Sequence, residues 1–436
     1  MIKLNTNRIL VYFIVIIAVS IASFTISSCH SKTANEKLVY WSSNNTEEIQ
    51  FGKEVIQEWN KNHPDNEIVF QPVPEGQSSE EVILAAVVGK TTPSIYGNMW
   101  QGDVEQYARA GKLIALDTLP GFNEFIYSRC DSSVVKEVTS IDGHIYQLPW
   151  KINPIMMIYN VDIFHEIGYD KPPRTYSEFL RAAEKIKKVD KNGYSVRWIG
   201  YVEVLVTWWQ RFFDFYPFYL AASNGGHLIE KGNVAFNNKY AIETFAFLKT
   251  LFDNKYLPRE RLSARQDAFL SSAIATRFTG PWEISHADKF KPEGFHYDFA
   301  PLPVPDDFIG EPYTYGDTKN IVIFNTCPNV TTAWNFLKTM LSEKNDYKFL
   351  RITSQLPRRK DLISNALFLK YFEEHPKMLP FAKQSKYVKG PDISEILKEV
   401  FDMISQQFEA CVVYGKITPE QAVNEAAKAT QLLLLK

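Results

Sequence analysis

Four tryptophans stand where an apolar, strand-like segment gives way to polar or turn residues. They are Trp41, Trp100, Trp150 and Trp282. In an α/β sheet this is where ligands are met, beyond the carboxyl ends of the strands. A flat ring can stack on the C–H face of a sugar, and Asp, Asn and Glu side chains can accept hydrogen bonds from its hydroxyl rim. These four residues therefore predict a site that could bind a sugar.

A second aromatic group runs from Trp208 to Tyr219 and includes Phe212, Phe213 and Phe215. A helix here cannot place every ring on one stripe, so we expect part of the segment to face a cleft. The three remaining tryptophans have contexts typical of core. Trp59 and Trp334 lie within amphipathic helical patterns, and Trp198 lies in a strand-like segment.

No motif gives a positive signal for catalysis. Gly89-Lys90-Thr91 resembles the end of a phosphate loop, but Leu84 stands where the first glycine would be required. Adjacent acids are best interpreted as solvated surface charge, because neighbouring side chains do not converge on one bond. These pairs are Glu47-Glu48, Glu80-Glu81, Asp306-Asp307 and Glu373-Glu374. A glycosidase would need two acids about 5–10 Å apart, and distant segments could still supply them.

Composition indicates a globular, near-neutral protein. The chain has 436 residues, of which 45% are hydrophobic and 22% charged, with a net charge of -2. This length predicts two or three domains, and the charge balance argues against a nucleic-acid partner. The aromatic content of 14% is high, and rings can form either core or a ligand-binding wall.

The elements that position these residues alternate along the first part of the chain. We expect strands at 38–41, 67–70 and 94–96. One expected helix has Phe51, Val55 and Trp59 on one face, and two further helices are expected over 82–88 and over 103–110. A β-α-β-α order favours a parallel sheet covered by helices.

The same alternation begins again after Asp142-Gly143, a hairpin signal. A strand is expected at 155–159 and a helix from the capping box Thr175-Tyr176-Ser177-Glu178 to Lys188. Asn237 or Asn238 starts a further helix, and Ala273 to Thr279 predicts a strand that ends at Gly280-Pro281-Trp282. A strand at 320–324, a helix at 329–341 and a last helix from Thr418-Pro419 follow. Two α/β units are expected.

The N-terminus has the pattern of an export signal. Lys3 and Arg8 precede an apolar run from Ile9 to Ala22, and Ile26-Ser27-Ser28-Cys29 resembles a bacterial lipobox. We predict a lipoprotein signal peptide over residues 1–28, lipidation of Cys29 and a polar tether over 29–37. The alternative is an uncleaved transmembrane anchor. Both place the remaining chain outside the cytoplasm, held at a bacterial membrane.

Three further cysteines, Cys130, Cys327 and Cys411, include no CxxC pair. This excludes zinc-ribbon and thioredoxin-like motifs. One disulfide is possible, but we favour buried free thiols.

Longer runs resemble the family 1 extracellular solute-binding proteins, the carbohydrate receptors of bacterial ABC importers, to which maltose-binding protein belongs. The most specific run is Asp142-Gly143-His144-Ile145-Tyr146-Gln147-Leu148-Pro149-Trp150. Other runs in the same order include Gln106 to Asp117, Lys171 to Tyr176, Ser223 to Gly226, Thr279 to Glu283, Pro301 to Pro303 and Leu356 to Lys360. The chain departs from the family at Ser94, where relatives often have Asp, and at Ser271-Ser272-Ala273, where they usually have Gly-Lys.

The resemblance implies an α/β, periplasmic-binding-protein-like fold of two hinged lobes with a ligand cleft between them. It places residues 38–152 and 316–356 in the N-terminal lobe, and 153–315 and 357–436 in the C-terminal lobe. Crossings between the lobes are expected near Asn153 to Ile155, Tyr313 to Gly316 and Leu356. Such receptors catalyse nothing and need no cofactor or metal.

The family's ligand loops map onto eleven candidate ligand-binding residues of this chain. They are Trp41, Ser43, Asn45, Asn98, Trp100, Asp103, Trp150, Asn153, Phe215, Trp282 and Asp317. The expected partners are a carbohydrate, the permease subunits of an ABC transporter and the membrane, contacted through the lipid on Cys29; a monomer is expected. The alternatives are a glycan-degrading surface enzyme, or the same fold binding a phosphorylated polyol, a polyamine or a metal.

Overall fold

The protein is represented by a computed structural model. It describes residues 37–74, 78–189, 191–193, 195–262 and 266–435, so the predicted signal peptide and Cys29 lie outside the described residues. From Leu38 onward the chain forms one compact unit. Among the described helices, none combines the length and hydrophobicity required to cross a membrane.

The larger sheet has six strands in the order β14-β4-β13-β3-β1-β2. Strand β1 pairs in parallel with β2 and β3, which confirms the parallel arrangement predicted from the alternation. Strand β13 runs antiparallel to both β3 and β4. The strands are β1 (Leu38–Ser42), β2 (Ile68–Pro72), β3 (Ile95–Trp100), β4 (Leu148–Ile152), β13 (Lys319–Ile323) and β14 (Leu356–Pro357).

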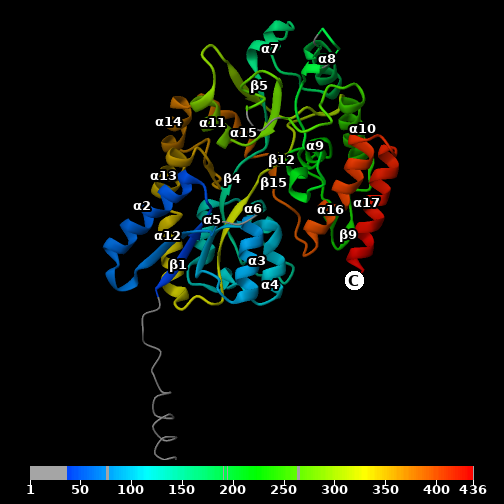
Figure 1. The fold of residues 1–436 in the computed structure, drawn as a ribbon. Coiled ribbons are helices and arrows are strands. Elements are labelled where there is room, and N and C mark those ends of the chain that lie inside the picture. The colour runs from blue at the N-terminus through cyan, green and yellow to red at the C-terminus, as the bar shows by residue number, and fades with distance from the viewer. Residues whose placement is uncertain (1–36, 75–77, 190, 194, 263–265, 436) are drawn as a thin grey trace, which may run out of the picture. The chain divides into compact units, whose positions relative to one another are not determined.

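Helices from two distant parts of the chain pack with this sheet. Helix α2 begins after Asn45, whose side chain accepts a hydrogen bond from the backbone N–H of Glu48, and it buries Phe51, Val55 and Trp59. Helices α12 and α13 come almost three hundred residues later and lie beside α2 (Figure 1). The helices are α2 (Thr46–Asn62), α3 (Ser79–Gly89), α4 (Val104–Arg109), α5 (Phe122–Arg129), α6 (Ser132–Glu137), α12 (Val330–Met340) and α13 (Glu343–Thr353).

The second sheet has three strands in the order β10-β5-β11, and both outer strands are antiparallel to β5. It therefore differs from the six-stranded sheet, which contains both parallel and antiparallel pairs, although its helices also alternate with strands. The strands are β5 (Met156–Asn160), β10 (Thr276–Thr279) and β11 (Tyr297–Ala300). Shorter pairs are β6 (Lys188–Val189) with β7 (Ser195–Arg197), β8 (Ile229–Glu230) with β9 (Asn233–Val234), and β12 (Thr314–Tyr315) with β15 (Val388–Lys389).

Local sequence signals place the helices of this second part well. The capping boxes at Thr175–Glu178 and Thr418–Gln421 are both formed. The cap at Asn238 is also present, as is the predicted cap at Asn329, which begins α12 beside the six-stranded sheet. The helices are α7 (Val161–Glu166), α8 (Tyr176–Ile186), α9 (Phe215–Ala222), α10 (Lys239–Asp253), α11 (Trp282–Phe290), α14 (Ala366–Glu374), α15 (Leu379–Gln384), α16 (Leu397–Phe408) and α17 (Pro419–Leu434).

Helix α9 contains a buried part of the aromatic segment from Trp208 to Tyr219. All eight of its residues are buried, so its rings do not face a cleft. The helix packs against α10, the 3₁₀ turn Trp208–Phe212 and β12, which together cover its sides. The exposed rings of the segment lie before the helix: Trp208 and Phe213 are partly exposed, and Trp209 is 44% exposed.

The chain passes between the two sheets at three segments that meet one another. The backbone N–H of Asn153 donates to the carbonyl of Gly316 at 2.6 Å, and that of Ile155 donates to Tyr315 at 2.9 Å. The side-chain amide of Asn153 donates to Gln355 at 2.9 Å, next to β14. These contacts lie where the crossings were predicted; the lobe boundaries derived from them stay a prediction.

Two sets of core clusters accompany the two sheets. Buried residues around the six-stranded sheet come from 38–148, Trp150 and 321–349. The other clusters come from 152–315 and 350–427, with Trp100 as the one member from the earlier part of the described chain. Cys130, Cys327 and Cys411 are buried free thiols, as we favoured.

Candidate functional site

Most of the predicted site residues gather at one edge of the six-stranded sheet. Residue Lys319, the first of β13, pairs with Trp100 near the end of β3 and with Lys151 near the end of β4. Since β1 is parallel to β3, the carboxyl ends of β1, β3 and β4 and the start of β13 share this edge. It carries Trp41, Ser43, Asn98, Trp100, Asp103, Trp150, Asn153 and Asp317. We call it the strand-end edge.

A buried ion pair occupies the middle of the strand-end edge. The Glu48 carboxylate contacts the Lys151 ammonium and accepts hydrogen bonds from Ser43 Oγ at 2.6 Å and from Gln355 Nε2 at 2.8 Å. Through Gln355 the network reaches Asn153. Burial alone would raise the pKa of Glu48, but Lys151 and these hydrogen bonds lower it below the usual value.

The pair Glu47–Glu48 was expected to be surface charge, and for Glu48 this is wrong. Its position explains the burial: Glu48 is the third residue of α2, and the first turn of that helix begins directly after β1. Glu80 is also mostly buried and contacts Lys319 at 2.9 Å. In both cases the partner lysine comes from a distant strand, so no local sequence signal indicates it.

Next to this network, Trp100 and Asp103 reach residues from the other part of the chain. Trp100 is buried, and its indole N–H donates to the hydroxyl of Tyr315 at 3.2 Å. Its ring contacts those of Trp208 at 5.2 Å and Phe212 at 5.5 Å. Asp103 pairs with Lys398 of α16 at 2.7 Å. These contacts join the strand-end edge to α16 and the 3₁₀ turn at 208–212.

Other predicted residues are placed less favourably for ligand contact. The Trp150 side chain is 1% exposed and packs on Phe51 and Phe349. Phe215 is fully buried beside Phe245. In this conformation neither ring presents a surface to a ligand, because both are enclosed by core. Their assignment as ligand contacts stays a prediction.

Asn45 and Asn98 are engaged locally. Asn45 caps helix α2, as described above, and its backbone N–H donates to Ser43 Oγ at 3.3 Å. The Asn98 amide donates to Ser79 Oγ at 3.4 Å. Asp317 has φ of 35°, in the left-handed region, between β12 and β13. All three residues lie near the strand-end edge but do not contact one another through any side-chain hydrogen bond described.

Trp282 is the first residue of α11 and is partly exposed. Its ring meets Phe213 edge-on at 6.4 Å. The ring also covers Gly280, where a Cβ atom would lie 2.1 Å from ring atom Cζ3. Glycine at this position therefore allows the indole to fold back over the end of β10, leaving part of the ring accessible.

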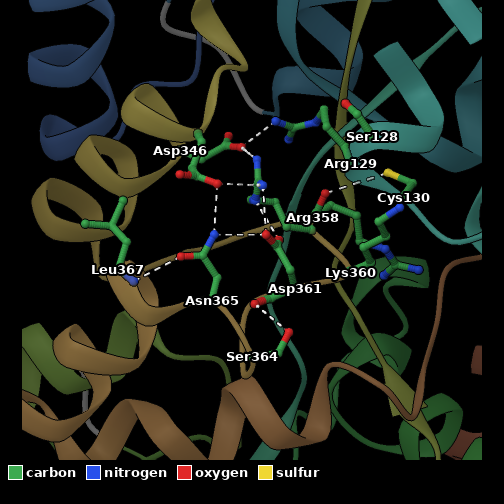
Figure 2. Close-up of polar contacts among 12 residues, drawn as sticks. Ser128, Arg129, Cys130, Asp346, Arg358, Lys360, Asp361, Ser364, Asn365 and Leu367 are labelled. Carbon is green, nitrogen blue, oxygen red and sulfur yellow. Dashed lines mark hydrogen bonds and ion pairs between the residues drawn. The ribbon is translucent and has the colours of Figure 1, made fainter. Parts of the chain in front are cut away.

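A second polar network holds the segment that follows β14 (Figure 2). Asp346 of α13 contacts Arg129 of α5 and accepts from Arg359 Nη1 at 3.0 Å. Arg359 also donates from Nε to Asp361 at 2.9 Å, and the Lys360 backbone N–H donates to the Arg129 carbonyl at 2.8 Å. The run Leu356 to Lys360 is thereby fixed to α5 and α13.

Glu137 makes a further connection that the sequence did not indicate. Its Oε2 accepts from Arg358 Nη2 at 3.1 Å, and its Oε1 accepts from the backbone N–H of Gly390 at 3.1 Å. Gln101 Nε2 donates to the adjacent carbonyl of Pro391 at 3.4 Å. The segment after β15 is thus a fourth part of the junction between the two sheets.

One cluster of metal-ligand residue types lies away from this edge. Asp267, Glu283 and His286 offer atoms within 4.8 Å of one another. The guanidinium of Arg277 lies between the two carboxylates, at 2.8 Å from Asp267 and 3.1 Å from Glu283. The guanidinium of one arginine therefore already pairs with both carboxylates of this cluster.

Comparison with known proteins shows the family of this chain. The family described as bacterial extracellular solute-binding protein matches residues 43–347. The chain belongs to this family.

Several relatives of this solute-binding protein have stated ligands. The maltotriose-binding protein of Pyrococcus abyssi is 24% identical over 386 residues, covering 83% of this chain and 78% of that protein. The arabinooligosaccharide-binding protein of Bacillus subtilis is 25% identical over 242 residues, covering 54% of this chain and 52% of that protein.

Solved structures share the fold. An uncharacterized protein from Listeria monocytogenes EGD-e has a TM-score of 0.79 and 28% identity, with 91% of this chain and 99% of that chain covered. This solute-binding protein therefore has the two-lobed α/β fold that we predicted, over nearly all of its described length.

Proposed function

We propose that this solute-binding protein is the receptor of an ABC importer and captures a sugar or oligosaccharide between its two lobes. The strand-end edge carries the proposal, because its Trp100 and Asp103 contact residues from the other part of the chain. Aromatic rings beside carboxylate and amide groups suit a ligand with an apolar face and a hydroxyl rim. The sugar-binding relatives support the same ligand class.

The charge at the strand-end edge favours an uncharged ligand. Two lysines of this edge and one lysine of α16 that faces it each contact a carboxylate, in the pairs Lys151–Glu48, Lys319–Glu80 and Lys398–Asp103. A phosphate group would call for cations free to bind it. With their charge already neutralised, these lysines suit a sugar better than a phosphorylated polyol.

A panel of ligands tests the function. Purified protein is titrated by calorimetry, and its melting temperature is measured with maltotriose, an arabino-oligosaccharide and sn-glycerol 3-phosphate. A ligand that binds only the folded state raises the melting temperature. We expect at least one sugar to raise the melting temperature and sn-glycerol 3-phosphate to leave it unchanged. If only sn-glycerol 3-phosphate bound, the ligand would be a phosphorylated polyol and not a sugar.

The same incubation separates a receptor from an enzyme. A binding protein releases its oligosaccharide unchanged, whereas a glycoside hydrolase generates new reducing ends. We expect no increase in reducing ends over hours at saturating oligosaccharide. A steady increase that depends on protein concentration would favour the enzymatic alternative.

We further propose that the mature protein is a monomeric lipoprotein, anchored outside the cytoplasm through Cys29 beside its permease. The apolar run and the lipobox-like residues Ile26 to Cys29 support this. Metabolic labelling with a fatty acid tests it: the wild-type protein takes up label and Cys29→Ala does not. Equal labelling of both proteins would contradict the anchor.

A further inference from the structure

Lys398 contacts groups from both parts of the molecule. It lies on α16, and its ammonium is 2.7 Å from Asp103 Oδ1. It also lies 5.8 Å from the centre of the Trp100 ring and 5.5 Å from that of Trp208. An ammonium within about 6 Å of a ring face is attracted by the ring's electrons. Lys398 therefore contacts Asp103 and Trp100 of the strand-end edge, and also Trp208, which lies beside α16.

The Asp103 carboxylate has one buried oxygen that lacks a hydrogen-bond partner among the described residues. Asp103 is 2% exposed, and its Oδ2 has no hydrogen-bond partner among the described residues. A buried acceptor without a partner is costly, typically by about 1–3 kcal/mol, and a ligand hydroxyl would satisfy it. The Lys398 contact occupies the other oxygen and leaves Oδ2 without a partner.

The Trp100 ring is also held by residues from the other part of the chain. Gly102 lies beneath its ring, where a Cβ would come within 2.3 Å of ring atom Cη2. The indole N–H is held by Tyr315, and Phe212 and Trp208 contact its ring. The position of the ring therefore depends on contacts with the opposite part of the molecule.

We propose that Lys398 is a positioning residue of the sugar site, which holds the Asp103 carboxylate and the Trp100 ring in place from α16. The proposal rests on the proposed function and adds a residue outside the eleven candidates. It means that the site is complete only when α16 lies against the strand-end edge.

The electrostatics agree with this role. Burial raises the pKa of Asp103, and Lys398 opposes that rise. The other charged or titratable groups that face Asp103 are Glu80 of α3, Lys319 of β13 and Tyr107 of α4. Removing Lys398 should therefore raise the pKa of Asp103 further.

The test compares Lys398→Met, Lys398→Arg and a matched control, Arg109→Met. Arg109 pairs with Glu395, which lies two residues before α16, at 2.5 Å. The Arg109 side chain is 74% exposed, and ion pairs of exposed side chains contribute little to stability. Maltotriose, or whichever sugar of the panel binds, is titrated into each protein. We expect Lys398→Met to weaken binding about 10-fold or more, the size of a hydrogen bond to a charged group. Lys398→Arg should retain much of the affinity, and Arg109→Met all of it.

Two further readouts separate positioning from general stability. In Lys398→Met the loss of affinity on acidification should begin at a higher pH than in the wild type, because Asp103 is protonated sooner. Near-ultraviolet circular dichroism without sugar should also change in Lys398→Met, and the change should vanish when both proteins carry Trp100→Phe.

Each outcome decides the proposal. Wild-type affinity and an unchanged pH profile in Lys398→Met would overturn it, as would a near-ultraviolet spectrum identical to that of the wild type. If the wild-type protein binds no sugar, the proposed function fails. In that case the circular dichroism comparison still decides whether Lys398 positions Trp100.

Discussion

Glu48 and Lys151 lie 103 residues apart in sequence, yet each neutralises the other inside the protein. Removing one partner of a buried ion pair is strongly destabilising, because the remaining charge is buried and has no solvent to screen it. The pair also supports Ser43 directly and Asn153 through Gln355, so two predicted ligand contacts depend on it. Its integrity should therefore be visible both in stability and in ligand binding.

We predict that Glu48→Gln lowers the free energy of unfolding by roughly 3–5 kcal/mol, because it leaves the Lys151 ammonium buried without a counter-charge. Urea unfolding at neutral pH measures this. The double variant Glu48→Gln/Lys151→Met should recover a large part of the loss. A single variant as stable as the wild type would contradict the ion pair.

The same residue predicts a pH dependence of stability. The folded protein lowers the pKa of Glu48 below its usual value of 4.5. Its contribution to stability is therefore fully present above 4.5 and is lost as the pH falls through the lower, folded value. Between neutral and acidic pH the wild type should lose more stability than Glu48→Gln does in urea unfolding; equal losses would argue against a lowered pKa.

Trp282 offers the clearest test of stacking, because it is partly exposed while Trp100 and Trp150 are buried. We expect Trp282→Ala to weaken sugar binding by about 2–4 kcal/mol, typical of an aromatic hot spot, with little change in melting temperature. Gly280→Ala should weaken binding in the same direction, since its Cβ would displace the ring. A Trp282→Ala protein that is unstable but binds normally would make Trp282 a core residue.

At the scale of elements, local signals predicted structure where the interaction itself is local. The capping box at Thr175 and the caps at Asn238 and Asn329 join residues two or three positions apart, and all are formed. The burial of Phe215 on α9 depends instead on elements far away in sequence. The pairing of Lys398 with Asp103 likewise joins segments that only the folded chain brings together. The gathering of the strand ends at one edge could therefore be predicted from the sequence, but their partners from distant segments could not.

The junction between the sheets depends on close backbone approach at Gly316. A Cβ atom there would lie 2.2 Å from Val388 Cγ1 and 3.2 Å from Ile152 Cγ1. We predict that Gly316→Ala lowers the free energy of unfolding by about 1–3 kcal/mol through overpacking. As a control, Gly89→Ala at the end of α3 meets no atom closer than 3.5 Å and should not destabilise. Equal stability of both variants in urea unfolding would mean that the junction adapts easily.

At the scale of the whole molecule, the two sheets are joined by several crossings and meet again through α16. Asn153, Gly316 and Gln355 form the crossings, while Asp103 and Trp100 contact Lys398 at some distance along the chain. A ligand that contacts both lobes gains most when they are together, and it should shift the population toward that arrangement.

We therefore predict that sugar binding makes the protein more compact. Small-angle scattering should give a smaller radius of gyration with saturating sugar than without it, because the ligand bridges the two walls of the site. Trp282→Ala at the same sugar concentration provides the control, since weaker binding should leave more of the protein in its sugar-free distribution. An unchanged radius of gyration for the fully bound wild type would contradict the hinge.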